Sequence, residues 1–311
     1  MPEPSVLVVF LDGVGLGEAD AHNPLSETYL PAFEQMVDGQ PWTADAAPVR
    51  GEMHLFRPID ATLGKDGLPQ SGTGQATLFT GTNCAKIVGH HFGPFPHSET
   101  KPVLETENVF RKVKALRADD DGTESAAFAN AYPPRFFSHA EEQDRWTVTT
   151  LCCRMANVRL RTEDDLRAGR ALPADLTGTA WREHLGCDVP VISEAEAGQR
   201  LAAVSREHAF TLFEYYLTDK VGHGRLADRS AGDVLRSLDR FFEGLLDTLD
   251  TERQLLIVTS DHGNVEDLSV KTHTLAPVPL VAYGRGADRF HSVHDLTGVT
   301  PAARKTLAHS G

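Results

Sequence analysis

Short apolar runs recur along the chain, and each has about the length of one β-strand. They cover residues 5–11, 210–217, 255–259 and 278–283, and the first reads Ser-Val-Leu-Val-Val-Phe-Leu. Runs that are apolar at nearly every position are typical of strands buried on both faces of a parallel sheet. Polar or glycine-rich residues follow each run. The pattern therefore predicts four central strands.

Helical patterns lie between these runs and after the last of them. Residues 27–37, 231–249 and 294–308 repeat their apolar positions at the spacing of one helix face. Strands and helices therefore alternate along the chain. This alternation predicts an α/β fold in which helices flank a mostly parallel central sheet.

The middle of the chain differs from both ends, because glycine, proline and charged residues become more frequent there and strand signals weaken. We interpret residues 84–206 as an inserted, smaller cap domain that covers a site on the core. Residues 1–83 and 207–311 would then form the α/β core domain. Within the insertion we expect strands at 125–130 and 146–152, helices at 108–116 and 193–207, and an exposed acidic turn at 118–122.

Composition and charge narrow the class of protein. The 311 residues are 41% hydrophobic and 24% charged, which excludes a mainly disordered chain. Acidic residues outnumber basic ones by 44 to 30, so the net charge of −14 disfavours nucleic acid and anionic membranes as partners. No apolar run approaches the ~18 residues of a membrane span. With no export signal and four cysteines lacking a Cys-x-x-Cys pair, we expect a cytoplasmic protein with reduced thiols.

Aspartates follow three of the predicted strands, and histidines lie close to them. The motifs are Asp12-Gly13, Asp219-Lys-Val-Gly-His223, Asp261-His262-Gly263-Asn264, and a further His273 before the last strand. Each motif alone also fits an ordinary turn. Because the carboxyl ends of parallel strands meet at one edge of a sheet, however, we expect these side chains to converge. Mixed oxygen and nitrogen ligands indicate a metal centre, and six of them exceed the usual three of one catalytic zinc ion, which suggests two metal ions.

A hydroxyl residue surrounded by glycines precedes another helical stretch. Ser71 stands in the segment Gln-Ser-Gly-Thr-Gly-Gln, where a helix start would offer backbone N–H groups to an anion. A metal-activated Ser71 could attack phosphorus or sulfur. The alternative is that Ser71 only caps the helix.

This ordered set of motifs resembles the alkaline phosphatase superfamily, most closely its branch with cofactor-independent phosphoglycerate mutase and phosphopentomutase. The resemblance covers residues 5–83 and 206–308, and it ends with His273 ahead of Pro277-Val-Pro279. It implies that one metal is held by Asp219, His223 and His273. The other would be held by Asp12, Asp261 and His262, with the Ser71 hydroxyl oxygen beside them. Manganese, zinc and magnesium all suit such a centre.

The resemblance implies metal-dependent chemistry on a small phosphorylated substrate. We expect a phosphatase or phosphodiesterase that acts through a phosphoserine at Ser71. The chain has Gln75 where the mutases tend to have histidine, and it is much shorter than a typical cofactor-independent phosphoglycerate mutase. Arg135, Arg154 and His91 are candidate substrate contacts. A phosphoglycerate or phosphosugar mutase is the alternative within the superfamily. A metal-binding protein without turnover is the alternative from another class. A sulfatase is disfavoured because Cys-x-Pro-x-Arg is absent.

Overall fold

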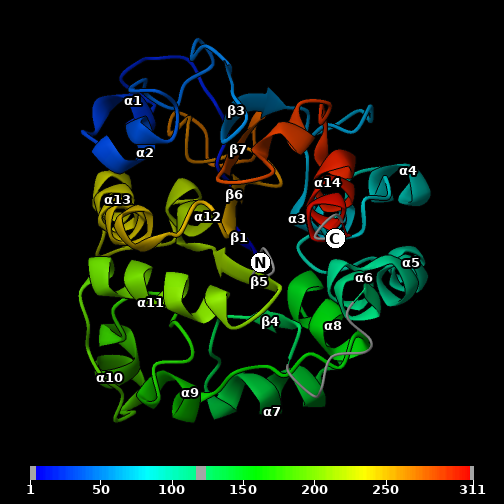
Figure 1. The fold of residues 1–311 in the computed structure, drawn as a ribbon, viewed down its shortest axis with the longest axis vertical. Helices are drawn as coiled ribbons and strands as arrows, with labels where there is room; N and C mark the ends of the chain where they lie inside the picture. The colour runs from blue at the N-terminus through cyan, green and yellow to red at the C-terminus, as the bar shows by residue number, and fades with distance from the viewer. Residues whose placement is uncertain (1–4, 117–123, 309–311) are drawn as a thin grey trace.

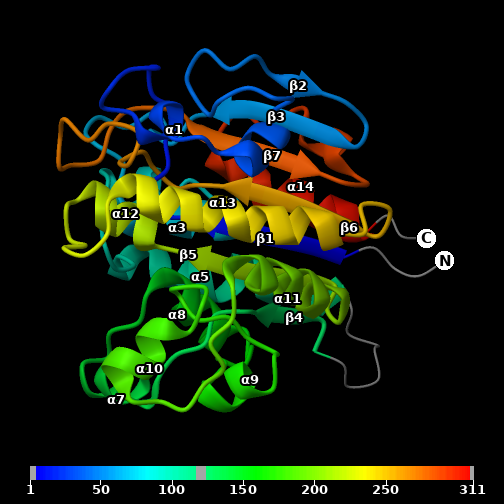
Figure 2. The same ribbon diagram turned by 90° about the vertical axis from the view of Figure 1, so that its left-hand side faces the viewer.

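A seven-stranded sheet forms the middle of the computed structural model, which describes residues 5–116 and 124–308. The strand order is β2-β3-β7-β6-β1-β5-β4. The strands are β1 (Ser5–Leu11), β2 (Val49–Arg50), β3 (His54–Ile59), β4 (Ala126–Phe128), β5 (Phe210–Tyr215), β6 (Gln254–Thr259) and β7 (Val278–Tyr283). The N-terminal strand β1 therefore lies near the centre, between two strands from the last third of the chain (Figures 1 and 2).

The sheet is mixed, with a parallel block and an antiparallel block. β4, β5, β1 and β6 run parallel, whereas β7, β3 and β2 are joined by antiparallel pairings. Parallel neighbours need a crossover that usually contains a helix. Residues 260–277 between β6 and β7 contain no helix, so β7 starts at the edge where β6 ends and runs back. The predicted α/β fold is confirmed, and the antiparallel block is its main departure from a mostly parallel sheet.

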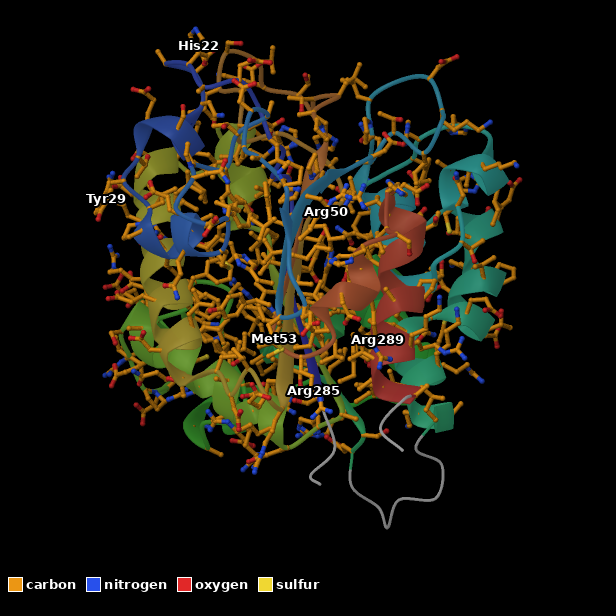
Figure 3. All side chains as sticks on the ribbon, turned by 45° about the horizontal axis from the view of Figure 1, so that its top comes forward. His22, Tyr29, Arg50, Met53, Arg285 and Arg289 are labelled. Atoms are coloured by element: carbon orange, nitrogen blue, oxygen red, sulfur yellow. The ribbon has the colours of Figure 1, made fainter. Side chains whose placement is uncertain are left out.

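Helices cover both faces of the sheet. On one face are α3 (Ser71–Thr80), α5 (Lys101–Glu107), α6 (Val109–Leu116), α8 (Val148–Met155) and α14 (Val299–Ala308). On the other are α1 (Pro24–Glu27), α2 (Pro31–Gln35), α11 (Glu194–Arg206), α12 (Leu217–Gly222) and α13 (Ala231–Thr248). Side chains fill the space between sheet and helices (Figure 3).

The alternation of side chains along β1 explains this three-layer arrangement. Successive strand residues point to opposite faces. Val6, Val8 and Phe10 belong to the apolar cluster under α3 and α14, and the Phe10 ring lies 5.6 Å from that of Phe79. The intervening residues of β1 belong to the cluster under α11 and α13. A strand buried on both faces must be apolar throughout, which is the pattern seen in the sequence.

The middle of the chain contributes both to this main body and to a small lobe. β4 extends the sheet beside β5, and α11 packs along α13. By contrast, α7 (Pro134–Glu142), α9 (Glu163–Arg167) and α10 (Thr179–Leu185) lie beyond β4, where Trp181 and Leu166 belong to a separate apolar cluster (Figure 1). The division into a core domain of residues 1–83 and 207–311 and a cap domain of residues 84–206 stays a prediction.

Two local predictions differ from the structure. The predicted strand at 146–152 is wrong, since Thr147 caps α8 there by accepting the N–H of Thr150. The helix expected at 27–37 is much shorter: α1 ends at Glu27 and α2 covers only Pro31–Gln35, because Pro31 cannot continue a helix and keeps Leu30 out of helical geometry. The acidic turn expected at 118–122 lies outside the described residues.

The remaining helices are short, and none crosses a membrane. They are α4 (Cys84–Val88) and the 3-10 helices η1 (Ser98–Thr100), η2 (Ala287–Phe290) and η3 (Leu296–Gly298). Within residues 5–116 and 124–308, the helices are all too short or too polar to span a bilayer.

Candidate metal centre

The carboxyl ends of β1, β5 and β6 place the predicted ligands side by side. Asp12 follows β1 directly, and Asp261 and His262 follow β6. The short helix α12 begins two residues after β5 and carries Asp219, with His223 at its end. The Thr218 hydroxyl donates to the Asp12 carbonyl at 2.6 Å and so joins the first two loops. His273 lies at the same edge because β6 and β7 are antiparallel, so the loop that joins them begins and ends at this edge.

Two groups of side chains have the spacing of a cation site. In Asp12, Asp261 and His262, the potential ligand atoms all lie within 4.8 Å of one another. The same holds for Asp219, His262 and His273. His262 belongs to both groups, with its Nε2 3.4 Å from Asp12 Oδ1. The two groups are therefore contiguous.

Ser71 and His223 complete the set of seven predicted residues. The Ser71 hydroxyl, in the first turn of α3, lies 2.9 Å from His262 Nε2. His223 Nε2 lies 3.2 Å from His273 Nε2 and 3.3 Å from Asp219 Oδ1. The structure thus brings all seven together. Their role as metal ligands stays a prediction.

The carboxyl groups of the centre repel one another in a buried environment. Burial and the neighbouring Asp219 raise the pKa of Asp261 to about 7, and burial together with Asp261 raises that of Asp12 well above its usual value. Asp12 Oδ1 and both carboxyl oxygens of Asp261 have no hydrogen-bond partner among the described residues. Buried carboxylates need a compensating cation. These oxygens therefore fit divalent metal ions.

The three histidines are held in the form that a metal requires. The Nδ1 atoms of His223, His262 and His273 face the carbonyls of Lys271, Gly263 and Pro69 at 2.9, 3.3 and 2.7 Å. A carbonyl only accepts, so each Nδ1 carries the proton and each Nε2 turns its lone pair to the centre. Burial and the nearby His273 also lower the pKa of His262 to about 3, which keeps its ring neutral.

Asp219 behaves differently from the other carboxyls. Burial would raise its pKa, but the neighbouring His273 and His262 rings and the Asn264 amide lower it to about 2. Asn264 Nδ2 donates to Asp219 Oδ1 at 2.7 Å. Asp219 is therefore the carboxyl of the centre that is most readily ionised.

Glu214 is a site residue that the sequence analysis missed. It is 6% exposed, and burial raises its pKa to about 7, with the nearby Thr149 hydroxyl opposing the shift. Its Oε2 and the Thr149 hydroxyl both lack hydrogen-bond partners among the described residues. Glu214 lines the same cavity as Asp12. The signal in the sequence was a single charged residue inside an apolar strand, Phe-Thr-Leu-Phe-Glu-Tyr.

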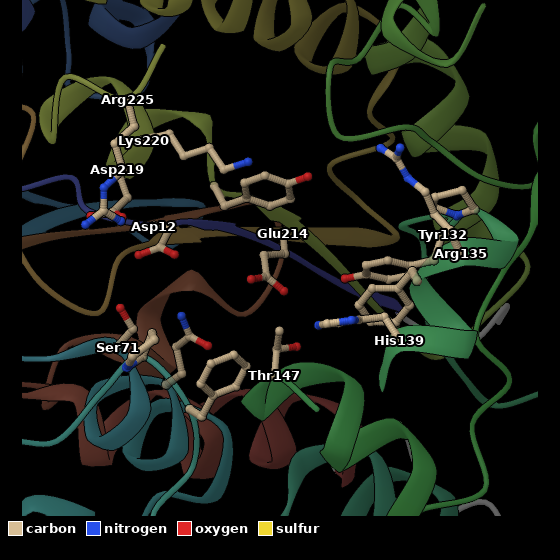
Figure 4. Close-up of a pocket in the computed structure, with 16 residues that line it drawn as sticks. Asp12, Ser71, Tyr132, Arg135, His139, Thr147, Glu214, Asp219, Lys220 and Arg225 are labelled. Carbon is tan, nitrogen blue, oxygen red and sulfur yellow. The ribbon is translucent and has the colours of Figure 1, made fainter. Parts of the chain in front are cut away.

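A cavity of about 800 Å³ opens from this centre. Asp12, Ser71 and Asp219 lie at one side, Tyr132, Arg135 and His139 at the other, and Glu214 between them (Figure 4). Phe95, Phe136 and Tyr216 add aromatic walls, and Lys220 and Arg225 add positive charge.

Of the three predicted substrate contacts, one lines this cavity. Arg135 belongs to its wall. Arg154 instead stacks over the Trp146 ring at 3.9 Å, and half-buried His91 also lies outside the lining. No pattern in the sequence distinguishes a basic residue that lines the cavity, such as Arg135, from one that does not, such as Arg154.

Comparisons with known proteins agree with this fold. Residues 190–309 match the family model of the Metalloenzyme superfamily. No curated protein sequence matches the chain significantly. The PH0037 protein from Pyrococcus horikoshii has a similar structure, with a TM-score of 0.56 and 12% identity over 99% of this chain and 98% of that one. Alkaline phosphatase from the Antarctic bacterium TAB5 is similar with a TM-score of 0.50 and 13% identity, over 99% and 98% of the two chains.

A third similar structure is the cold-active alkaline phosphatase from a psychrophilic Shewanella species. Its TM-score is 0.50 at 12% identity, and the match covers 97% of this chain and 99% of that one. At such identities the neighbours establish the fold alone. The fold is therefore alkaline phosphatase-like, and the match of residues 190–309 to the Metalloenzyme superfamily model agrees with the resemblance that the motifs predicted.

Proposed function

Because the chain has an alkaline phosphatase-like fold and its residues 190–309 match the Metalloenzyme superfamily, we propose that it hydrolyses phosphate esters with two divalent metal ions. Manganese, zinc or magnesium would be held by the two groups of ligands around His262. One observation carries the proposal. The Ser71 hydroxyl lies 2.9 Å from His262 Nε2, beside both groups and at the mouth of the cavity.

When bound, the metal ions would supply Lewis acidity and offset the negative charge of the phosphate and of the leaving oxygen. The protein's own contribution begins with the placement of Ser71. It is the first residue of α3, where the positive end of the helix dipole favours an anion. A Cβ at Gly72 would lie 2.2 Å from the Phe95 carbonyl oxygen, so the 92–95 loop packs directly on this turn. Ser71 is therefore held in one position.

The reaction would run in two displacements. Ser71 Oγ loses its proton and forms a bond to phosphorus while the ester oxygen leaves, and the departing alcohol gains a proton. Water then attacks the phosphoserine, returns the proton to Ser71 and releases phosphate. Holding the reactants in line supplies most of the rate in such a site.

The cavity would receive the organic part of a small phosphorylated substrate. Its aromatic walls contact apolar groups, and Arg135 lies across the cavity from Ser71 (Figure 4). A mutase is the second candidate, because Arg135, Lys220 and Arg225 supply positive charge that could retain a phosphorylated intermediate. Hydrolysis releases inorganic phosphate, whereas a mutase conserves the ester.

Ser71→Ala tests the nucleophile. With p-nitrophenyl phosphate or its diester and added Mn²⁺, Zn²⁺ or Mg²⁺, we expect kcat to fall by about 10³-fold or more, because the attacking group is lost. Mn²⁺ binding should persist, since six other ligands remain. Quenching the wild-type enzyme with substrate should leave a phosphoserine at Ser71 that mass spectrometry detects.

The control is Thr80→Ala at the other end of the same helix, where the hydroxyl donates to the Ala76 carbonyl and accepts the N–H of Thr82. Near-full activity of Ser71→Ala, with no phosphoserine in the wild type, would show that Ser71 is not the nucleophile; capping of α3 is no explanation either, because Gln70 is its N-cap and no side chain of the described residues caps it. A metal-loaded protein that turns over no phosphate ester in a broad panel would favour the non-catalytic alternative.

A further inference from the structure

One buried carboxyl outside the two ligand groups joins the loops that carry them. Glu266 is 2% exposed and lies in the β6–β7 loop. Its Oε2 accepts the backbone N–H of Gly15 at 2.9 Å and that of Asn264 at 2.7 Å. Its Oε1 accepts the hydroxyl of Thr274. Three donors thus converge on a single side chain.

Each donor belongs to a segment that carries a predicted ligand. Gly15 lies three residues after Asp12, Asn264 two residues after His262, and Thr274 directly after His273. The Asn264 side chain in turn donates to Asp219 Oδ1 at 2.7 Å and to its carbonyl at 3.2 Å. All four ligand-bearing segments are therefore connected through Glu266 and its neighbour Asn264.

Glycines make room for this carboxyl. A Cβ at Gly15 would lie 2.5 Å from Glu266 Cδ, one at Gly17 2.9 Å from Cγ, and one at Gly263 2.2 Å from Oε1. Backbone from two loops therefore packs against the Glu266 side chain with no space for a larger residue. This packing explains Gly15 and Gly17, whereas a Cβ at Gly13 would instead lie 2.9 Å from Asp219 Cβ.

We propose that Glu266 is a positioning residue, which fixes the spacing of the ligand-bearing loops and so sets the metal affinity without contacting metal or substrate. The inference rests on the proposed metal centre but not on the proposed reaction. Hydrogen-bonding partners that orient metal ligands typically contribute about 10- to 100-fold in affinity. Glu266 acts one step further out, on the loop backbones.

Three substitutions at Glu266 separate the effect of its hydrogen bonds on Mn²⁺ affinity from the effects of its charge and its length. Glu266→Gln retains an oxygen for the two N–H groups and an NH₂ group that can donate to the Thr274 hydroxyl, so we expect its Mn²⁺ affinity to stay within about threefold of wild type. Glu266→Ala removes all three hydrogen bonds, and Glu266→Asp is too short to make them together. For both we expect calorimetric titration with Mn²⁺ to show about 10- to 100-fold weaker binding.

The matched control is Asp239→Ala. Asp239 is also a buried carboxyl that accepts two backbone N–H groups, those of Ala32 and Phe33 at 2.9 and 3.1 Å, but it lies on α13 away from the centre. Its loss should lower stability and leave Mn²⁺ affinity unchanged. Co²⁺ absorption provides a second readout, and it should change shape for Glu266→Ala but not for Asp239→Ala.

Each result of these metal-binding measurements supports or overturns the proposal. A folded Glu266→Ala that binds Mn²⁺ like the wild type overturns the proposal, as does a Glu266→Gln variant that loses as much affinity as Ala. If Ala fails to fold, Asp and Gln decide by the same comparison. A wild-type protein that binds no divalent cation overturns both the centre and this inference. Metal binding with the expected order of variants, but without phosphate-ester turnover, supports the inference and removes only the proposed reaction.

Discussion

Asp12, Glu214 and Asp261 place three carboxyl groups in a buried space next to one another. The pKa of each is raised, to about 7 for Glu214 and Asp261, because burial disfavours the charged form. A carboxyl whose pKa is raised on folding binds more protons in the folded state than in the unfolded one. Between the unfolded and folded pKa values it therefore lowers the free energy of unfolding as pH rises.

This sign predicts an unusual pH dependence for the metal-free protein. In the presence of a chelator, we expect the urea midpoint to fall as pH rises from about 4.5 to about 7, because the buried carboxyls must ionise. Glu214→Gln should reduce this slope, whereas Glu105→Gln on the exposed side of α5 should leave it unchanged. A midpoint that rises with pH over this window in the chelated wild type contradicts the assignment. Added Mn²⁺ should abolish the fall, because the carboxylates then have a cation.

At the scale of single residues, the ligands could be predicted because each stands in a local signal. Asp12 and Asp261 follow apolar strands directly, and His262 is adjacent in sequence. Glu266 could not be found in this way, because its partner Gly15 is 251 positions away and the hydrogen bond exists only after folding. Arg154 illustrates the opposite case: its charge suggested a phosphate contact, and the structure places its guanidinium on the Trp146 ring instead.

At the scale of elements, α11 and α13 pack closely against each other. Both have capping boxes, at Ser193 and Ser230, and both were predicted nearly to the residue because caps and amphipathic periodicity coincide there. They approach through glycines. A Cβ at Gly198 would lie 2.0 Å from the Phe241 carbonyl oxygen, and one at Gly244 2.0 Å from that of Ala195.

Gly198→Ala should therefore destabilise the fold although alanine is the better helix former. We expect urea unfolding to show a loss of about 1–3 kcal/mol, because the two backbones must move apart. Gly232→Ala is the control, since the nearest atoms there belong to the end of the flexible Arg236 side chain. Mn²⁺ affinity should be retained in both variants. Equal stability of Gly198→Ala and wild type would contradict the close approach.

Segments without such coinciding signals were harder to predict. Residues 146–152 are rich in β-branched and apolar side chains, which favoured a strand, but burial against the sheet and the Thr147 cap make them helical. The direction of β7 could not be predicted from the sequence either, because it depends on whether the preceding loop crosses to the other edge of the sheet. The local sequence pattern thus predicted the positions of helices and strands better than it predicted how strands distant in sequence pair.

At the scale of the whole molecule, the proposed metal centre connects the loops that follow β1, β5 and β6. A cation that binds only the folded chain stabilises it by mass action, by about 2.7 kcal/mol at a concentration 100 times the Kd. We therefore expect Mn²⁺ to raise the Tm by several degrees over the chelated protein in differential scanning calorimetry. Asp261→Asn should need more Mn²⁺ for the same shift, and excess metal should partly restore its activity. A Tm that is the same with chelator and with added Mn²⁺ would contradict the proposed metal centre.

The position of β1 also has a consequence for synthesis. Val6 pairs with Phe210 and with Leu255, so the two neighbours of this strand are translated roughly two hundred and roughly two hundred and fifty residues after it. At bacterial and eukaryotic elongation speeds, the ribosome needs roughly 10–50 s to reach them. Throughout that interval the most apolar strand of the protein, and the aspartate at its end, have no sheet to join. A nascent chain of this design must be kept from aggregating until its final third emerges, and only then can the ligands assemble.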